Sequence, residues 1–197
     1  MDLSDRLLLR AFQEQVAYSC RAVLLGFEDV QLGLEELGSE AESGRLWYGV
    51  QNLVIGAGNV SKALWGTGPT QELRDRRYAE RQPLRDSLGV TDTSPLRRIK
   101  IRNDFEHLDE RIEDWWNESK SRSRIGILIG PRGSVGGAGW DDMNTLRWLD
   151  PESGDVIFWG NELHIPSVVN EVNWLWPVAE AEGNKPHWQP RTSGGGL

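Results

Sequence analysis

Residues 4–38 of the chain read SDRLLLRAFQEQVAYSCRAVLLGFEDVQLGLEELG, and this stretch decides the fold. Apolar side chains recur in it with a period of about 3.6 residues, which predicts one long amphipathic helix over residues 5–37. The apolar positions are Leu7, Leu8, Phe12, Val16, Val23, Phe27, Val30, Leu34 and Leu37. Ser4 or Asp5 is the expected N-cap, and Gly38 is the expected end of the helix.

The same period returns in residues 47–64 and predicts a second helix that pairs with the first. Its apolar positions are Trp47, Val50, Leu53, Val54, Ala57, Val60 and Leu64. This helix contains Gly56-Ala57-Gly58, which looks at first like the glycine turn of a dinucleotide-binding fold. That turn needs a preceding strand and a third small glycine, whereas the flanking residues here have a helical pattern. We therefore interpret Gly56, Ala57 and Gly58 as small residues that let the helix approach a neighbour closely.

Two further helical segments are predicted before residue 120. Residues 70–82 are charged and helical in propensity, and Pro83 opens a short turn that ends at Gly89. Ser94 caps a fourth helix, which we expect to run without a break from Pro95 to about residue 119. Its apolar stripe consists of Ile101, Phe105, Leu108, Ile112 and Trp115, at the spacing of one helix face.

Beyond residue 119 the apolar period shortens to two residues, which predicts a small antiparallel sheet. The expected strands cover residues 125–129, 145–149 and 156–159. The turn from Asp150 to Asp155 contains proline and glycine and favours a hairpin. The glycine-rich residues 130–139 lack the G-K-[ST] ending of a phosphate-binding loop, so we interpret them as a connector. Pro166 opens a last helix, which is expected to end near Glu182.

These segments predict a mainly α fold with three parts. An antiparallel bundle of four to five helices covers residues 1–120. A small β-hairpin or sheet with a C-terminal helix covers residues 121–182, and a flexible tail covers residues 183–197.

The composition is that of an ordinary globular protein. The 197 residues include 22 Lys and Arg against 30 Asp and Glu, and the net charge of -8 argues against an indiscriminate nucleic-acid binder. The single cysteine, Cys20, excludes an internal disulfide and is expected to be a small buried residue of a protein from a reducing compartment. The acidic N-terminus and the lack of an apolar run of about 18 residues predict a cytoplasmic protein without a membrane span. No metal ligand set is expected, because His164 and His187 have no Cys or His at ligand spacing, and no cofactor is expected either.

Candidate chemistry lies on the fourth predicted helix, where residues 99–111 read IKIRNDFEHLDER. His107 has the residue type that takes a proton from a ribose 2′-OH or gives one to a leaving 5′-oxygen, and Arg102 is suited to stabilise phosphate charge. Asn103 and His107 share a helix face, whereas Arg102 and His107 lie roughly 140° apart around an ideal helix. One chain therefore brings the arginine and the histidine together poorly.

This segment resembles the R-x4-6-H signature of the HEPN superfamily, whose arginine is typically followed by a polar residue such as Asn103. The resemblance covers about residues 4–119 and implies a HEPN-like bundle. It also implies a metal-independent ribonuclease, of toxin or defence type, in which Arg102, Asn103 and His107 of two copies form one catalytic site in a homodimer. An antitoxin or a nucleotidyltransferase is a partner that the resemblance allows. Some toxins of this superfamily carry a modified tyrosine two residues after the histidine, where this chain has Asp109.

A basic segment precedes the motif. Residues 73–102 contain nine Lys and Arg against four Asp and Glu, and we expect Arg97, Arg98 and Lys100 to bind the RNA substrate. A solvated helix face is the alternative interpretation of these charges. The alternative for the motif is an ordinary pair between Arg102 and Glu106, in a non-catalytic module that binds a nucleotide or a protein. The ten tryptophans of the chain fit either core packing or a contact surface.

Overall fold

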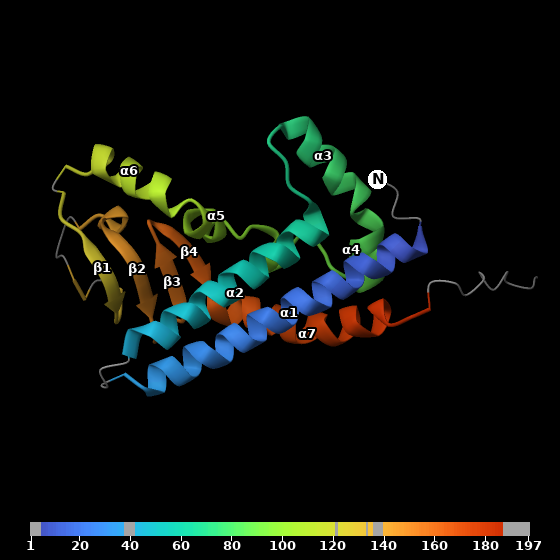
Figure 1. Cartoon of the computed structure of the whole chain (residues 1–197), viewed down its shortest axis with the longest axis horizontal. Coiled ribbons are helices and arrows are strands. Elements are labelled where there is room, and N and C mark those ends of the chain that lie inside the picture. Colours follow the sequence, from blue (N-terminus) through green and yellow to red (C-terminus); the bar gives the residue numbers. More distant parts are fainter. Residues whose placement is uncertain (1–4, 38–41, 121, 133, 136–139, 187–197) are drawn as a thin grey trace, which may run out of the picture.

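A computed structural model describes residues 5–37, 42–120, 122–132, 134–135 and 140–186. Two long antiparallel helices form the centre of the fold, as predicted (Figure 1). They are α1 (Arg6–Glu35) and α2 (Glu42–Trp65). The carboxylate of Asp5 caps α1 by accepting hydrogen bonds from the backbone N–H groups of Leu7 and Leu8, at 2.9 and 3.2 Å. The apolar stripes of both helices pack in the core, which accounts for the regular spacing in the sequence. Leu7 and Leu37, at the two ends of the predicted first stripe, are exposed instead.

Glycines bring α1 and α2 into close contact. A Cβ atom added to Gly26 of α1 would lie 2.6 Å from the backbone nitrogen of Leu53, and one added to Gly49 of α2 would lie 2.7 Å from the carbonyl oxygen of Gly26. Gly33 and Gly56 face the opposite helix in the same way. The interpretation of Gly56 as a point of close approach is therefore confirmed, and residues 54–61 lie inside a helix, with no strand among the described residues that precede them.

A third long helix, α7 (Ile165–Gly183), runs along α1 in the opposite direction (Figure 1). Its buried residues belong to the same hydrophobic core as α1 and α2. At its C-terminal end, Glu182 pairs with Arg10 of α1 at 3.3 Å. The core is thus completed by residues far along the chain, and α7 ends where the flexible tail was expected to begin; residues 187–197 of that tail lie outside the described residues.

Two short helices, α3 (Gln71–Glu80) and α4 (Gln82–Leu88), follow α2. No residue of α3 is buried, and the helix leans away from the α1–α2 pair (Figure 1). Helix α4 is anchored by Leu84, Leu88 and the buried Arg85, whose guanidinium donates to the carbonyl oxygen of Leu64 at 2.7 Å. The buried charge of Arg85 is therefore compensated by hydrogen bonds to backbone oxygens.

The predicted fourth helix is broken, which corrects the expectation of one continuous helix. Residues 95–119 form a 3₁₀ turn (Pro95–Arg97), helix α5 (Ile101–Glu106) and helix α6 (Leu108–Glu118). The break falls at His107, which has φ −116° and ψ 45°. Periodicity alone does not reveal it, because both short helices keep their apolar residues in phase with one another.

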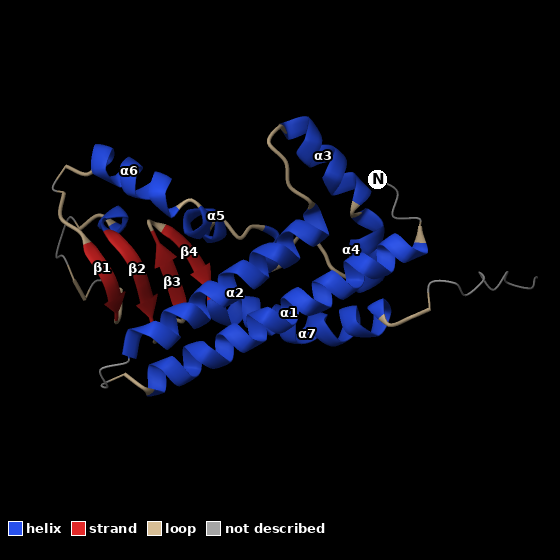
Figure 2. Ribbon diagram, in the orientation of Figure 1, coloured by secondary structure: helices blue, strands red, loops and turns tan. Residues whose placement is uncertain are grey.

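A four-stranded sheet lies at one end of the helices (Figure 2). Its strands, in spatial order, are β1 (Ile125–Ile129), β2 (Thr145–Asp150), β3 (Asp155–Phe158) and β4 (Asn161–His164). The predicted hairpin is confirmed, with Asp150 opposite Asp155. The prediction of a wholly antiparallel sheet is wrong, because β1 pairs with β2 in parallel. Parallel strands that follow one another cannot be joined by a tight hairpin turn, so β1 and β2 are not the two arms of a hairpin. Part of the glycine-rich segment between them lies outside the described residues.

Strand β4 was not predicted. It follows β3 through Trp159 and Gly160, which have φ values of 47° and 75°. Successive residues of positive φ are typical of a tight two-residue hairpin turn, a conformation that the non-glycine residue Trp159 does not signal in the sequence. In the described residues, no helix combines the length and apolar character needed to cross a bilayer.

The contact between α1 and α2 predicts opposite effects for two glycine substitutions in α2. Gly49→Ala is expected to lower the free energy of unfolding by about 1–3 kcal/mol, because its Cβ meets the backbone of α1. Gly44→Ala is the matched control, since a Cβ there meets nothing within 4 Å, and it is expected to raise stability by up to about 1 kcal/mol through helix propensity. Urea denaturation of both variants measures the difference, and equal effects would contradict the packing argument.

Burial also predicts that Cys20 is unreactive in the folded protein. The side chain is fully buried, and burial together with the negative charge of Glu171 raises the pKa of its thiol to about 12. We expect a thiol reagent such as dithionitrobenzoate to label Cys20 at neutral pH only after urea unfolds the protein, because the thiolate is the reacting form. Rapid labelling of the native protein would show that α1 opens locally.

Candidate functional site

Arg102, the first residue of the predicted motif, lies against α2. Its side chain is only 9% exposed, and a Cβ atom at Gly58 would overlap the Cδ atom of Arg102. The interpretation of Gly58 as a point of close approach is thus confirmed, and the neighbour is an arginine side chain. The guanidinium pairs with Glu106, one turn further along α5, and the other carboxylate oxygen of Glu106 lies 3.9 Å from the ammonium of Lys62.

The rest of α5 is fixed to the sheet and to α6. Asp104 is buried, accepts a hydrogen bond from the side-chain amide of Asn161 at 2.7 Å and pairs with Arg111 at 2.8 Å. Burial raises the pKa of the Asp104 carboxyl above its ordinary value, although Asn161 and Arg111 both oppose that shift. Phe105 stacks on Phe158 of β3 with ring centroids 4.0 Å apart. Helix α5 therefore has contacts with α2, α6 and the sheet.

His107 and Asn103 are exposed and adjacent. The backbone N–H of His107 donates to the carbonyl oxygen of Asn103 at 3.0 Å, at the C-terminal end of α5. The imidazole is 55% exposed, and its Nδ1 lies 3.5 Å from a carboxylate oxygen of Glu110. The structure thus brings Asn103 and His107 onto one exposed segment, whereas Arg102 is directed into the contact with α2.

The predicted substrate-binding residues lie just before α5. Arg98 and Lys100 are exposed, and Lys100 is the residue from which α5 starts. Arg97 is half-buried, because its guanidinium pairs with Asp92 at 3.3 Å and lies 5.7 Å from the ring centre of Tyr78. Of the three cations, Arg98 and Lys100 are therefore the ones open to a ligand.

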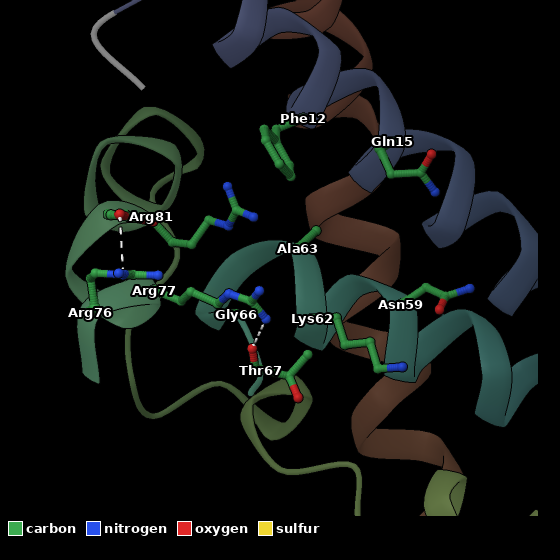
Figure 3. Close-up of a pocket in the computed structure, with 11 residues that line it drawn as sticks. Phe12, Gln15, Asn59, Lys62, Ala63, Gly66, Thr67, Arg76, Arg77 and Arg81 are labelled. Carbon is green, nitrogen blue, oxygen red and sulfur yellow. Dashed lines mark hydrogen bonds and ion pairs between the residues drawn. The ribbon is translucent and has the colours of Figure 1, made fainter. Parts of the chain in front are cut away.

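A basic cleft opens between α3 and the α1–α2 pair, with a volume of about 770 Å³ (Figure 3). Four cationic side chains line it, namely Lys62 from α2 and Arg76, Arg77 and Arg81 from α3 and its C-cap. The basic run in the sequence pointed to the three arginines. Lys62 was missed, because it lies within an apolar helical pattern that gives no sign of a neighbouring basic helix.

Lys62 connects the cleft to α5. Burial and the positive charge of Arg102 lower the pKa of its ammonium, and the charge of Glu106 opposes that shift. Lys62 therefore lies between the cleft and the ion pair of Arg102 and Glu106. The described residues hold no group of three His, Cys, Asp or Glu side chains placed to bind a metal ion.

Comparison with known proteins gives no match: no protein-family model, no characterised protein and no solved structure is significantly similar to the chain.

The buried carboxylate of Asp104 predicts a particular pH dependence. Because its pKa is higher in the folded than in the unfolded chain, its contribution to the free energy of unfolding is fully present below the unfolded pKa and falls as the pH rises through the folded pKa. We expect the wild-type protein to exceed Asp104→Asn in stability by more at about pH 3.5 than at about pH 7. Urea denaturation at both pH values tests this, and an advantage that grows with pH would mean that the ion pair with Arg111 outweighs the cost of burial.

Proposed function

We propose that this chain is a metal-independent endoribonuclease of HEPN type that acts as a homodimer. The observation that supports it most is the position of His107, whose imidazole is open to solvent at a helix junction, one turn after the exposed Asn103. The preceding helix is held by Arg102, Asp104 and Phe105, so the histidine is carried by a supported segment. General acid–base catalysis on a bulky substrate needs this combination of access and support.

The proposed reaction is internal transesterification of RNA. His107 of one copy takes the proton from a ribose 2′-OH, and the 2′-oxygen forms a bond to the adjacent phosphorus. The bond from phosphorus to the 5′-oxygen breaks, and His107 of the other copy donates a proton to that oxygen. The products are a 2′,3′-cyclic phosphate and a 5′-hydroxyl end. The homodimer supplies both the base and the acid, because each copy contributes its own His107 to the site.

Arg102 stabilises phosphate charge only after its ion pair with Glu106 has broken. In the single chain its guanidinium is neutralised by that carboxylate, and it serves to position α5 against α2. The exposed Arg98 and Lys100 are then the first cations to meet the substrate phosphates, and Asn103 orients the phosphate or the imidazole. Arg102 contacts phosphate only where Glu106, which is 40% exposed, turns away.

A non-catalytic binding module is the second candidate. The ion pair between Arg102 and Glu106 favours it, because oppositely charged residues at i and i+4 pair in ordinary helices that bind no substrate. The two candidates differ in turnover. A ribonuclease yields cyclic phosphate ends, whereas a binding module retains its ligand unchanged.

The test is cleavage of RNA in EDTA by wild-type protein and by His107→Ala. We expect wild-type protein to cleave single-stranded or transfer RNA to cyclic phosphate products, and the variant to lose at least about 100-fold in rate, as removal of a general acid–base group does. His164→Ala is the matched control, because His164 is also about half exposed and also pairs with a carboxylate, Asp155, outside the motif.

Light scattering of the same samples tests the homodimer. A dimer whose cleavage depends on His107 and not on His164 supports the proposal. Binding of RNA without cleavage by wild-type protein would favour the binding module, and equal activity in His107→Ala would overturn the assigned mechanism.

A further inference from the structure

The basic cleft has the dimensions of a small-molecule site. Its volume of about 770 Å³ lies within the range of roughly 300–1,000 Å³ that is typical of ligand pockets. Three helices form its walls: Phe12 and Gln15 come from α1, Asn59 and Lys62 from α2, and the arginines from α3 and the residue after it (Figure 3). The α3 wall contributes little to the core, since none of its residues is fully buried and Tyr78 packs against the core only partly buried. The outward lean of α3 therefore creates the cleft.

The charge of the cleft is strongly positive in an acidic protein. Lys62, Arg76, Arg77 and Arg81 line it together with the carboxylate of Glu80, which lies 3.8 Å from Arg76. A second carboxylate, that of Glu106 in α5, lies 3.9 Å from Lys62, so the cations still outnumber the carboxylates by four to two. Excess cations in a partly enclosed space repel one another, which costs stability unless an anion enters. The cleft therefore favours a ligand with more than one negative charge.

Two of the arginines are held in place before any ligand binds. The guanidinium of Arg77 donates a hydrogen bond to the carbonyl oxygen of Thr67, just after α2. The guanidinium of Arg81 lies 3.8 Å from the centre of the Phe12 ring. The hydrogen bond of Arg77 to Thr67 uses one of the five N–H donors of its guanidinium group. Holding the side chains beforehand reduces the entropy lost on binding.

We propose that the cleft between α3 and the α1–α2 pair binds a small ligand that carries two or more phosphate groups, such as a nucleoside triphosphate. Arg76, Arg77 and Lys62 contact the phosphates from opposite walls, because arginine and lysine are the side chains that bind phosphate through charge-assisted hydrogen bonds. The amides of Gln15 and Asn59 offer donors and acceptors to the rest of the ligand. A small ligand is favoured over a nucleic-acid strand, because these cations gather in one cavity between three helices. The proposal does not depend on the ribonuclease function.

Isothermal titration calorimetry of the full chain tests the cleft, with ATP, inorganic pyrophosphate and a 20-nucleotide RNA as separate probes in low salt without divalent cations. The cleft variant is Lys62→Gln combined with Arg76→Gln, whose side chains are 40% and 66% exposed. The control is Arg21→Gln combined with Arg124→Gln, two exposed arginines outside the cleft with the same total change in charge. Thermal melting of both double variants verifies that they are folded.

Saturable binding of ATP that weakens about tenfold or more in the cleft variant, and less than about twofold in the control, is the expected result. Binding of pyrophosphate with the same affinity as ATP also supports the site and shows that the phosphates alone are recognised. No saturable binding of ATP or pyrophosphate, or equal weakening by the control, overturns the proposal. Binding of the RNA without binding of ATP or pyrophosphate also overturns it, and indicates that the cations of the cleft contact an RNA strand instead. His107 does not line the cleft, so we expect His107→Ala to bind ATP as the wild-type protein does. The binding test therefore holds whether or not the cleavage assay detects ribonuclease activity.

Discussion

The close approach of α1 and α2 is the constraint on which the other contacts depend. Glycine has the lowest helix propensity after proline, costing about 1 kcal/mol relative to alanine, yet α1 and α2 keep glycines where the two backbones meet. The spacing of seven residues between Gly26 and Gly33, and between Gly49 and Gly56, holds these positions on one face of each helix. The cost is offset because the helices bury their apolar stripes against one another over their length. Gly58 extends the same device to α5, where the space is filled by Arg102.

Helix α5 is too short to be stable by itself and is defined by its neighbours. With six residues it falls well below the length of about 12–15 at which isolated helices become even marginal. Consecutive side chains point to different partners: Arg102 to α2, Asp104 to β4 and α6, and Phe105 to β3. These contacts connect the helices to the sheet. They also determine which motif residues remain exposed, namely Asn103 and His107.

The sequence predicted those parts of the fold that rest on local patterns. The long helices α1 and α2, the hairpin at Asp150–Asp155 and the helix opened by Pro166 follow from periodicity and turn chemistry, and the structure has all of them. The break at His107 and the parallel pairing of β1 follow from tertiary contacts, so no local pattern reveals them. At the candidate site, the pair between Arg102 and Glu106 is confirmed from its i, i+4 spacing. The place of Lys62 beside the arginines of α3 depends on the angle between two helices, which the sequence does not specify.

The packing of α7 against α1 has a consequence for how the protein is made. Ile165, where α7 begins, leaves the ribosome long after Glu35, where α1 ends. At a synthesis rate of about 5–20 residues per second, the interval between these two residues is on the order of ten seconds. During that time the face of α1 that α7 covers has no partner from its own chain. Such a nascent chain exposes apolar surface for longer than a bundle built from successive hairpins does.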